Sequence, residues 1–204
     1  MTTEDRLGRM LAQTAPQAVT DLPDLGEAAA AAGLLDVAYA TLDSPAGPLL
    51  VASTPRGLVR LAYIDDGEQE VLEELSRRVS PRLLRSARKL DQPRRELDQY
   101  FAGARRQFEI SLDWQLISDF GRRILSATAR VPYGSVSTYR QVAAEAGSPK
   151  GARAAGNALG ANPIPIVLPC HRILHADGGL GGYTGGLDRK RLLLSIESGQ
   201  QQLG

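Results

Sequence analysis

The stretch NPIPIVLPCHR, residues 162–172, contains Cys170, the only cysteine in this chain of 204 residues. The apolar run from Ile164 to Leu168 predicts a short buried strand. Pro169 should end that strand, because proline has no N–H to give to a central ladder. We therefore expect Cys170 at the end of a strand, where a turn can present its thiol to a ligand.

Cys170 by itself fits two interpretations. A lone cysteine behind an apolar run most often packs as a small hydrophobic residue. The imidazole of His171 could instead lower the pKa of the thiol and make it reactive. Successive residues of a strand point to opposite faces, so the two side chains could cooperate only through a turn or a water. The spacing alone leaves both interpretations open.

Two short helices are predicted upstream, over residues 138–146 and 150–161. Thr138, with Gln141 three residues later, forms a capping box for the first helix. Gly147, Ser148 and Pro149 then break the helix, and the second helix is rich in glycine and alanine. Two short helices with a turn of this kind fit a helix-turn-helix, and an ordinary tight helix pair fits as well.

These segments together resemble one protein family. PCHR, with Asn-Pro starting eight residues before the cysteine and GYTGGLDRKRLLLSIE (182–197) after it, resembles the active-site segment of the O6-alkylguanine-DNA alkyltransferases. These are also called methylated-DNA-protein-cysteine methyltransferases. VPYGSVSTYRQVAAEAG (131–147) and SPKGARAAGNALGANP (148–163) resemble the helix-turn-helix of that family. SDFGRRIL (118–125) departs from the family pattern, in which this helix usually has a Thr-Pro-Phe-Gln-like start.

The resemblance implies direct-reversal DNA repair by a suicide methyltransferase. In this family the alkyl group of O6-alkylguanine, and by extension of O4-alkylthymine, passes from a flipped base to the cysteine by an SN2 displacement. S-alkylcysteine is a stable thioether, so each molecule should act once. The implied partner is double-stranded DNA containing O6-alkylguanine, bound by a monomer, with no cofactor and no metal.

The resemblance also implies the residues of the chemistry. Cys170 would accept the alkyl group, and His171 would pass the thiol proton through a water towards Glu197. Asn162 would brace the active-site turn. Arg172 would hold the local structure, since arginine stays protonated. Without the resemblance, Glu197 would be expected to be a surface carboxylate at a helix end.

Contacts to DNA and to the base follow from the same resemblance. Arg153 would fill the space left by the flipped base, and Tyr139 would help to rotate the phosphate and contact the guanine. As ordinary residues, Arg153 would be a solvated cation and Tyr139 a half-buried aromatic. The other residues expected at the DNA are Lys150, Ala152, Gly156 and Lys190. Those expected to line the substrate pocket are Tyr183, Thr184, Pro165 and Val167.

Two other classes of protein fit parts of the sequence less well. An alkyltransferase-like protein that binds lesions without repairing them lacks the nucleophile, and here Cys170 is present. A cysteine hydrolase of unrelated fold would need an Asp or Asn linked to His171 by a motif, which the sequence does not show. His175 is expected to be a plain loop residue. The glycine-dense segment 178–187 lacks the strand-then-helix context of a phosphate-binding loop.

Composition narrows the class of protein. No apolar run approaches the roughly 18 residues of a membrane helix, and MTTEDRLGRM is too polar for a secretory signal, so we expect a cytoplasmic protein, associated with the nucleoid in a bacterium. One cysteine excludes an internal disulfide, and two histidines leave too few ligands for a dedicated zinc site. Residues 1–117 hold 14 basic and 18 acidic side chains, a net −4, whereas residues 118–204 hold 10 and 5, a net +5. The basic half is compatible with a modest phosphate footprint.

The first half of the chain predicts a small α/β domain with an antiparallel sheet. Short β-like runs separated by SPAG and TPRG turns predict a three-stranded meander over 36–42, 48–53 and 58–64. Apolar periodicity predicts the remaining elements, namely helices over 68–79, 92–101, 117–130 and 188–195 and extended segments over 82–87 and 107–114. The predicted fold is α+β. Its parts are an N-terminal extension of unknown role (1–34, with a possible helix over 4–13), an α/β scaffold domain (35–113) and a mostly helical, winged-helix-like domain with the helix-turn-helix (114–204).

Overall fold

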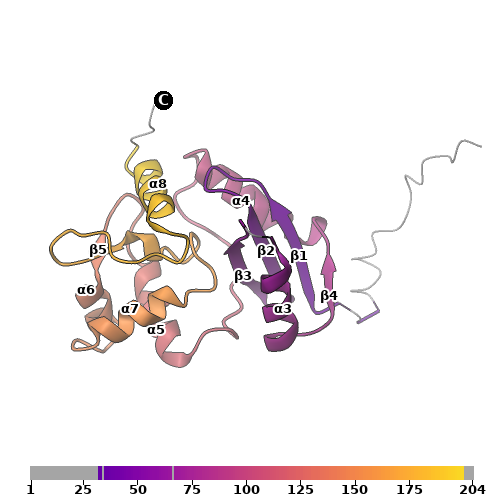
Figure 1. Cartoon of the computed structure of the whole chain (residues 1–204), viewed down its shortest axis with the longest axis horizontal. Coiled ribbons are helices and arrows are strands. Elements are labelled where there is room, and N and C mark those ends of the chain that lie inside the picture. The colour runs from indigo at the N-terminus through magenta and orange to yellow at the C-terminus, as the bar shows by residue number, and fades with distance from the viewer. Residues whose placement is uncertain (1–31, 34, 66, 200–204) are drawn as a thin grey trace, which may run out of the picture.

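A sheet and a group of helices lie side by side in the computed structural model of the chain (Figure 1), which confirms the predicted fold class. The structure describes residues 32–33, 35–65 and 67–199. The helix predicted over 4–13 lies outside the described residues, as does nearly all of the extension over 1–34. Among the described residues, no helix is both long enough and apolar enough to cross a membrane.

The sheet contains the three strands that the sequence predicts. β1 (Val37–Leu42), β2 (Leu49–Thr54) and β3 (Gly57–Tyr63) form an antiparallel meander. β4 (Leu83–Arg85) pairs in parallel with the free edge of β1, which gives the order β3-β2-β1-β4. β3 is therefore an edge strand, and it is the strand that faces the helical half (Figure 1).

Alternation along β2 gives the sheet two apolar faces. Leu49 and Val51 belong to one core cluster and Leu50 to another, because successive side chains of a strand point to opposite faces. α3 (Gln69–Arg78) covers the face of Leu50. α4 (Asp91–Phe101) packs on the face of Leu49, which it shares with the helical half. Both helices lie where the sequence predicts them.

Four α-helices make up most of the described part of the second half. α5 (Asp119–Ala129), α6 (Tyr139–Glu145) and α7 (Ala152–Gly160) pack against one another, and α6 and α7 form the predicted helix pair. α8 (Leu187–Glu197) is the last element of the described chain and lies at the top of Figure 1.

A capping box begins α6, as the sequence predicts. The Thr138 hydroxyl accepts the Gln141 backbone N–H at 3.2 Å, and the Gln141 side chain accepts the Thr138 N–H at 2.9 Å. Thr138 also ends β5 (Ser137–Thr138), which pairs in parallel with β6 (Ile173–Leu174). Because β6 follows residues 170–172 directly, this two-stranded ribbon ties the start of α6 to the segment that holds the cysteine.

The strand predicted over Ile164–Leu168 is wrong, because this run forms a buried turn. The Leu168 N–H donates to the Ile164 carbonyl at 2.9 Å, so the chain folds back on itself. Ile166 has a φ of 73°, which costs a residue with a Cβ atom roughly 1–2 kcal/mol. Ile164 and Ile166 are both fully buried, and their burial holds the turn in this conformation.

The strand predicted over residues 107–114 is also wrong. The segment pairs with the sheet in the manner of a strand only at an isolated bridge between Leu58 and Leu112. There the Leu58 N–H donates to the Ser111 carbonyl and the Asp113 N–H to the Leu58 carbonyl, each at 2.8 Å. A Cβ atom at Gly57 would lie 2.2 Å from the Ser111 oxygen, so the two backbones meet where only glycine fits.

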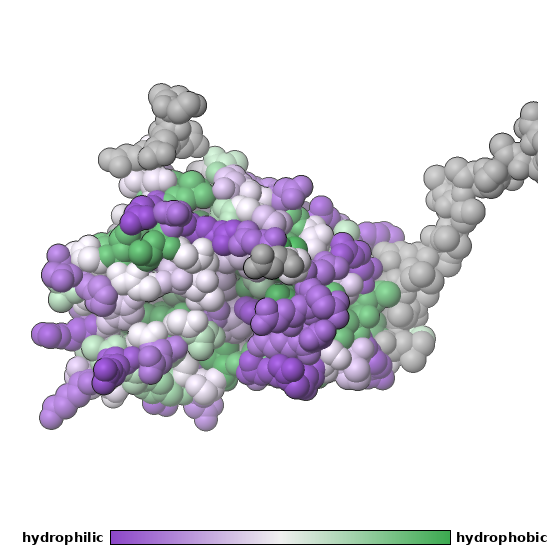
Figure 2. Space-filling model, in the orientation of Figure 1, coloured by the Kyte–Doolittle hydropathy of each residue, from purple (hydrophilic) through white to green (hydrophobic). Residues whose placement is uncertain are grey.

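One core cluster joins the two halves. It contains Leu49 and Leu58 of the sheet, Tyr100 of α4, Ile124 of α5 and Leu193 of α8. The surface differs between the halves: Figure 2 shows hydrophilic side chains gathered over α3 and long hydrophilic side chains projecting near α6 and α7.

Candidate active site

Cys170 lies in a short 3-10 helix, η2 (Cys170–Arg172), rather than at the end of a strand. The turn over 162–169 leads into this helix, and Pro169 precedes it. Cys170 is only 5% exposed, yet it lines a cavity. The geometry therefore unites the two interpretations of the sequence, because the thiol is buried by the protein and still open to a ligand.

Asn162 holds the turn under the thiol with every polar atom of its side chain. Its carbonyl oxygen accepts the Ile164 N–H at 3.0 Å. Its amide nitrogen donates to the Leu168 carbonyl at 2.8 Å and lies 3.2 Å from the Cys170 sulfur. Asn162 is 2% exposed, so these bonds are sheltered from water. The structure thus brings Asn162 and Cys170 together as the sequence predicts.

His171 is fully buried, and its Nε2 lies 2.8 Å from Glu197 Oε1. Burial lowers the pKa of His171 below its ordinary 6.5, although the bond to Glu197 opposes the shift, so the imidazole is neutral at pH 7. A neutral ring facing an ionised carboxylate carries its proton on the nitrogen that bonds the carboxylate, and we assign it to Nε2. Nδ1 is then an acceptor, and it bonds to no described residue.

Glu197 is the centre of a buried hydrogen-bond network, not a surface carboxylate. Arg172 donates to both carboxylate oxygens, at 2.8 and 2.9 Å, and the Tyr100 hydroxyl donates at 2.9 Å. The Gly134 N–H adds a contact of 3.2 Å. Burial by itself raises the pKa of Glu197, but the bonds from His171 and Arg172 lower it to about 2. The carboxylate is therefore ionised and fixes the orientation of His171.

The thiol itself is protonated in the resting protein. Burial raises the pKa of Cys170 from 9.0 to about 11, against smaller opposing effects of the Asn162 bond and the Lys190 charge. A neighbouring imidazole does not lower the thiol pKa here, because His171 is neutral and its Nε2 faces Glu197. A nucleophilic Cys170 must therefore lose its proton during the reaction.

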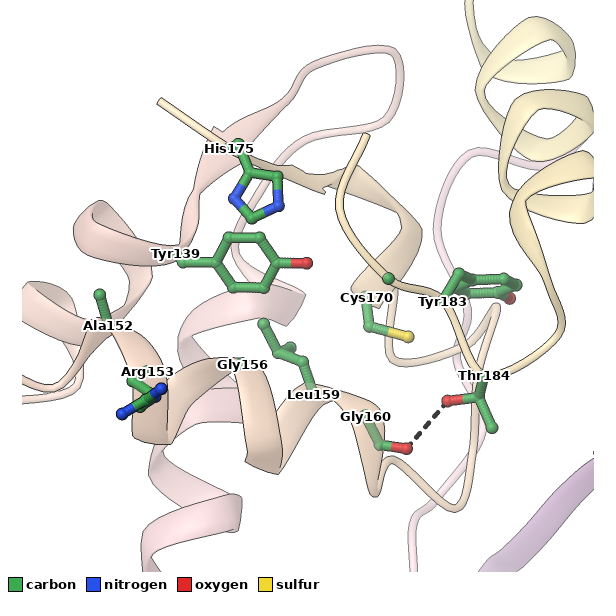
Figure 3. A pocket seen from close by; sticks show the side chains of 11 residues that line it. Tyr139, Ala152, Arg153, Gly156, Leu159, Gly160, Cys170, His175, Tyr183 and Thr184 are labelled. Carbon is green, nitrogen blue, oxygen red and sulfur yellow. Dashed lines mark hydrogen bonds between the residues drawn. The ribbon is translucent and has the colours of Figure 1, made fainter. Parts of the chain in front are cut away.

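A cavity of about 560 Å³ opens beside the sulfur, between α7 and the loop that precedes α8 (Figure 3). This volume lies within the range of small-molecule sites. The residues that line it are Tyr139, Ala152, Arg153, Gly156, Leu159, Gly160, Cys170, His175, Gly182, Tyr183 and Thr184.

α7 forms one side of the cavity, and the sulfur lies near the end of α7 that carries Gly160 (Figure 3). Arg153 and Lys150 are exposed at the start of this helix, and Gly156 is half-buried. Tyr139 is half-buried too, and its pKa is raised chiefly by burial, so its hydroxyl keeps its proton. The structure gathers most of the residues expected at the DNA around one opening.

Tyr183 and Thr184 line the cavity, as the sequence predicts. The Thr184 hydroxyl donates to the Gly160 carbonyl at 3.0 Å, so it ties the loop to the end of α7 (Figure 3). Pro165 and Val167 are not among the lining residues. Pro165 instead lines a second cavity against the sheet half, and Val167 packs against the core, because the predicted strand is a turn.

The prediction that Lys190 contacts DNA is wrong. This lysine is fully buried, and its ammonium donates to the carbonyls of Ile173, at 2.6 Å, and of Leu180. Burial lowers its pKa from 10.5 to about 8. An apolar helix in sequence gives no sign that a lysine will point inward to bind loop carbonyls, so charge alone suggested a surface contact.

His175 is a cavity residue that the sequence did not reveal. Its ring centroid lies 5.2 Å from that of Tyr139, with the planes tilted by 43° (Figure 3). It follows β6 directly, and the pairing of β6 with β5 is what carries it to the start of α6. No motif contains His175, so only the pairing of these two short strands could have indicated its place.

Two family models match the chain. The one described as 6-O-methylguanine DNA methyltransferase, ribonuclease-like domain, matches residues 37–114. The one described as 6-O-methylguanine DNA methyltransferase, DNA binding domain, matches residues 119–199. Together the two matches take in every strand and helix from β1 to α8.

Known proteins resemble the chain over most of its length. The methylated-DNA–protein-cysteine methyltransferase of Mycolicibacterium paratuberculosis is 40% identical over 161 residues, which are 79% of this chain and 92% of the relative. The protein of that name from Methanosarcina barkeri is 35% identical over 159 residues, 78% and 96% of the two chains. The crystal structure of the Mycobacterium tuberculosis O6-methylguanine methyltransferase matches with a TM-score of 0.69 and 36% identity, over 82% and 96%. The Mycobacterium tuberculosis OGT in complex with DNA matches with a TM-score of 0.67 and 34% identity, over 80% and 94%.

Proposed function

Because this chain belongs to the 6-O-methylguanine DNA methyltransferase family, we propose that Cys170 is the residue to which it transfers the alkyl group of O6-alkylguanine. The protein repairs DNA by direct reversal, as a methylated-DNA–protein-cysteine methyltransferase that binds DNA. O4-alkylthymine presents the same alkyl–oxygen bond and is the second substrate we propose. The observation that carries the proposal is the position of the Cys170 sulfur at a cavity bordered by the helix-turn-helix.

The reaction breaks one bond and forms one. The sulfur attacks the alkyl carbon from the side opposite O6, the S–C bond forms and the C–O bond breaks. The electron pair of the broken bond stays on the guanine, which takes up a proton. The thiol proton leaves towards Nδ1 of His171, a buried acceptor, and the imidazolium that forms is stabilised by the ionised Glu197. Because the thioether is stable, each molecule acts once.

The base must leave the duplex to reach the sulfur. Extrusion costs a few kcal/mol, and a planar cation placed in the vacated stack can offset part of this cost. Arg153 is exposed at the cavity rim on α7 and is the residue we propose for that place. Tyr139 keeps its proton and lines the cavity, so it can donate to the flipped base. The protein would act as a monomer in the cytoplasm, at the nucleoid of a bacterium.

A mass measurement tests the proposal. The protein is incubated with a duplex containing O6-methylguanine and digested, and the peptides are weighed. We expect one methyl group on the peptide that contains Cys170 and none in the Cys170→Ala variant. Many repaired duplexes per unmodified protein molecule would contradict the single-use mechanism. Binding of the duplex without any transfer would favour a lesion-binding protein instead.

A further inference from the structure

We propose that Tyr63, a residue of the sheet half, is a positioning residue for the alkyl transfer. It holds Tyr183 and the loop that walls the cavity, and through them it limits the size of the O6 substituent that the site accepts. The inference rests on the proposed function and adds to it a contribution from the half of the chain that lacks the cysteine.

A direct hydrogen bond connects Tyr63 to the cavity wall. Tyr63 is the last residue of β3, and its hydroxyl oxygen lies 2.9 Å from that of Tyr183. The two rings meet edge to face, with centroids 6.2 Å apart and planes at 68°. Tyr183 lines the cavity and also stands edge-on to His171, with ring centroids 6.4 Å apart. A shift of Tyr63 would therefore move a wall that also touches the buried histidine.

The hydroxyl of Tyr63 is suited to this structural use. Burial raises the pKa of Tyr63 to about 12, against a smaller opposing effect of its bond to Tyr183. The pKa of Tyr183 is raised as well, again chiefly by burial. Both hydroxyls are protonated at neutral pH, so one donates to the other, and neither can act as a base.

The loop that precedes α8 also packs against the Tyr63 ring, in addition to the hydrogen bond between Tyr63 and Tyr183. A Cβ atom at Gly185 would lie 2.4 Å from the Tyr63 ring, so the backbone approaches the ring as closely as glycine allows. Arg189 belongs to α8, and its guanidinium lies 4.3 Å from the centroid of the Tyr63 ring. The guanidinium donates to the carbonyls of Ala46, at 2.6 Å, and Gly185, at 3.2 Å. It also pairs with Asp65. These contacts fix the ring between the sheet, the loop and α8.

The two tyrosines line two different cavities. Tyr183 lines the cavity beside the sulfur, and Tyr63 lines a second cavity of about 540 Å³ against α3. Thr184, the residue after Tyr183, lines both. An O6 substituent larger than methyl needs room beside the sulfur, and the wall that separates it from the second cavity yields only if the bond between the tyrosines breaks.

The test compares two substrates in one variant. Tyr63→Phe removes the hydroxyl and keeps the ring under Arg189. Second-order rate constants for modification of Cys170 are measured with two duplexes of the same sequence, one containing O6-benzylguanine and the other O6-methylguanine. We expect the benzyl-to-methyl ratio to rise about fivefold, which corresponds to roughly 1 kcal/mol, the net value of one hydrogen bond. Tyr39→Phe, which removes a hydroxyl from β1 of the same sheet, is the matched control and should leave the ratio unchanged.

A second variant shows whether Tyr63 acts through Tyr183. Tyr183→Phe breaks the same bond from the other side. The benzyl-to-methyl ratio of the double variant, Tyr63→Phe with Tyr183→Phe, should therefore equal that of Tyr183→Phe alone. An unchanged ratio in Tyr63→Phe, equal losses with both substrates, or additive effects in the double variant would each overturn the proposal. Absence of any transfer by the unaltered protein would instead contradict the proposed function itself.

Discussion

The environment of the Cys170 sulfur keeps the thiol protonated until the reaction takes place. Burial holds the thiol protonated, with a pKa of about 11, and the Asn162 amide points at the sulfur from 3.2 Å. A protonated thiol reacts slowly with electrophiles that reach it by chance, which protects a residue that can be used only once. In the mechanism proposed above, this proton passes to His171 when an alkyl group is in place beside the sulfur.

The raised pKa of Cys170 predicts the pH dependence of non-specific alkylation. Without DNA, the rate at which iodoacetamide modifies Cys170 should rise about tenfold per pH unit between pH 7 and 10, because the thiolate fraction grows that steeply below the pKa. The protein unfolded in guanidinium is the control, and its rate should level off near the ordinary thiol pKa. Labelling measured by mass at each pH checks this. A plateau below pH 9 in the folded protein would contradict the raised pKa.

Glu197 should be the most costly carboxylate to neutralise. In Glu197→Gln the buried Arg172 loses its charge partner, and breaking a buried pair in this way costs about 3–5 kcal/mol. Glu145→Gln is the control, because its pair with Arg130 spans 3.6 Å at the surface, where such pairs contribute about 0–1 kcal/mol. Urea unfolding at pH 7 measures both differences. Similar losses in the two variants would contradict the buried network.

The gap between Glu197→Gln and the unaltered protein should narrow in acid. The pKa of Glu197 is about 2 in the fold and 4.5 ordinarily, so the ionised form is favoured by folding. The stabilisation is complete above pH 4.5 and is lost as the pH falls towards 2. The pKa of His171 is lowered below 6.5, so the free energy of unfolding of the unaltered protein also falls as the pH falls through 6.5. Urea midpoints measured between pH 7 and 3 follow both effects.

At the scale of elements, α7 is the helix that combines the cavity and the surface. Arg153 is exposed on α7, and Gly156 lines the cavity. A Cβ atom at Gly156 would lie 3.7 Å from the Tyr139 ring, which is an ordinary contact. One face of the helix thus approaches the base pocket while its start remains free to meet a duplex. The chemistry and the extraction of the base can therefore be impaired separately.

Arg153→Ala should slow repair of O6-methylguanine in duplex DNA at least tenfold and leave the reaction with free O6-benzylguanine within about twofold. The reason is that the free base needs no extrusion, whereas the flipped base leaves a gap that the arginine would fill. Arg95→Ala, an exposed arginine of α4, is the control and should change neither rate. Equal losses with both substrates would show that Arg153 serves the pocket rather than the duplex.

The regular strands and helices could be predicted from the sequence, whereas the irregular turn before Cys170 could not. The strands of the meander, α3 to α8 and the Thr138 capping box follow from local apolar patterns and cap residues, which the fold leaves intact. The run Ile164–Leu168 has the composition of a strand, but Pro165 within it cannot donate to a ladder, and Asn162 supplies the bonds of a turn instead. The bonds of Asn162 and the burial of Ile164 and Ile166 decide between the strand and the turn.

The candidate site divides in the same way. Cys170, His171, Asn162 and Glu197 come from a motif whose spacing the fold preserves, so the structure brings them together as predicted. Lys190, His175 and Tyr63 depend on contacts between segments far apart in the chain. Lys190 turns inward to bind loop carbonyls, and His175 reaches the cavity through the pairing of β6 with β5. No local pattern contains that information.

At the scale of the whole molecule, the two matched segments share one core. Sheet, α4, α5 and α8 contribute to a single apolar cluster, and β3 also bonds to the active-site turn, where the Leu61 N–H donates to the Pro163 carbonyl at 2.9 Å. Asp113, 3% exposed, accepts from Thr54 and Arg56 and so anchors the connection to the sheet. Few elements could separate without exposing part of this cluster.

The protein should therefore unfold in one cooperative transition. Trp114, the only tryptophan, lies in the connection between the halves, with Arg122 5.4 Å from its ring. Its fluorescence should change at the same urea concentration as the far-ultraviolet circular dichroism, since both report the same event. Two separated midpoints would show that the halves unfold independently in spite of the shared cluster.

The pair Asn162–Pro163 has a consequence for the chemical ageing of the protein. Asparagine is ordinarily lost by deamidation, when the backbone nitrogen of the next residue attacks the side-chain carbonyl and closes a succinimide, and a proline nitrogen has no hydrogen to give up. Asn157, followed by Ala158, has no such protection in sequence. After months of storage, peptide mapping should find residue 162 still an amide. A carboxylate at position 162 could not donate to the Leu168 carbonyl or to the Cys170 sulfur, as the Asn162 amide does. The sequence therefore preserves this amide in a protein that has not yet reacted.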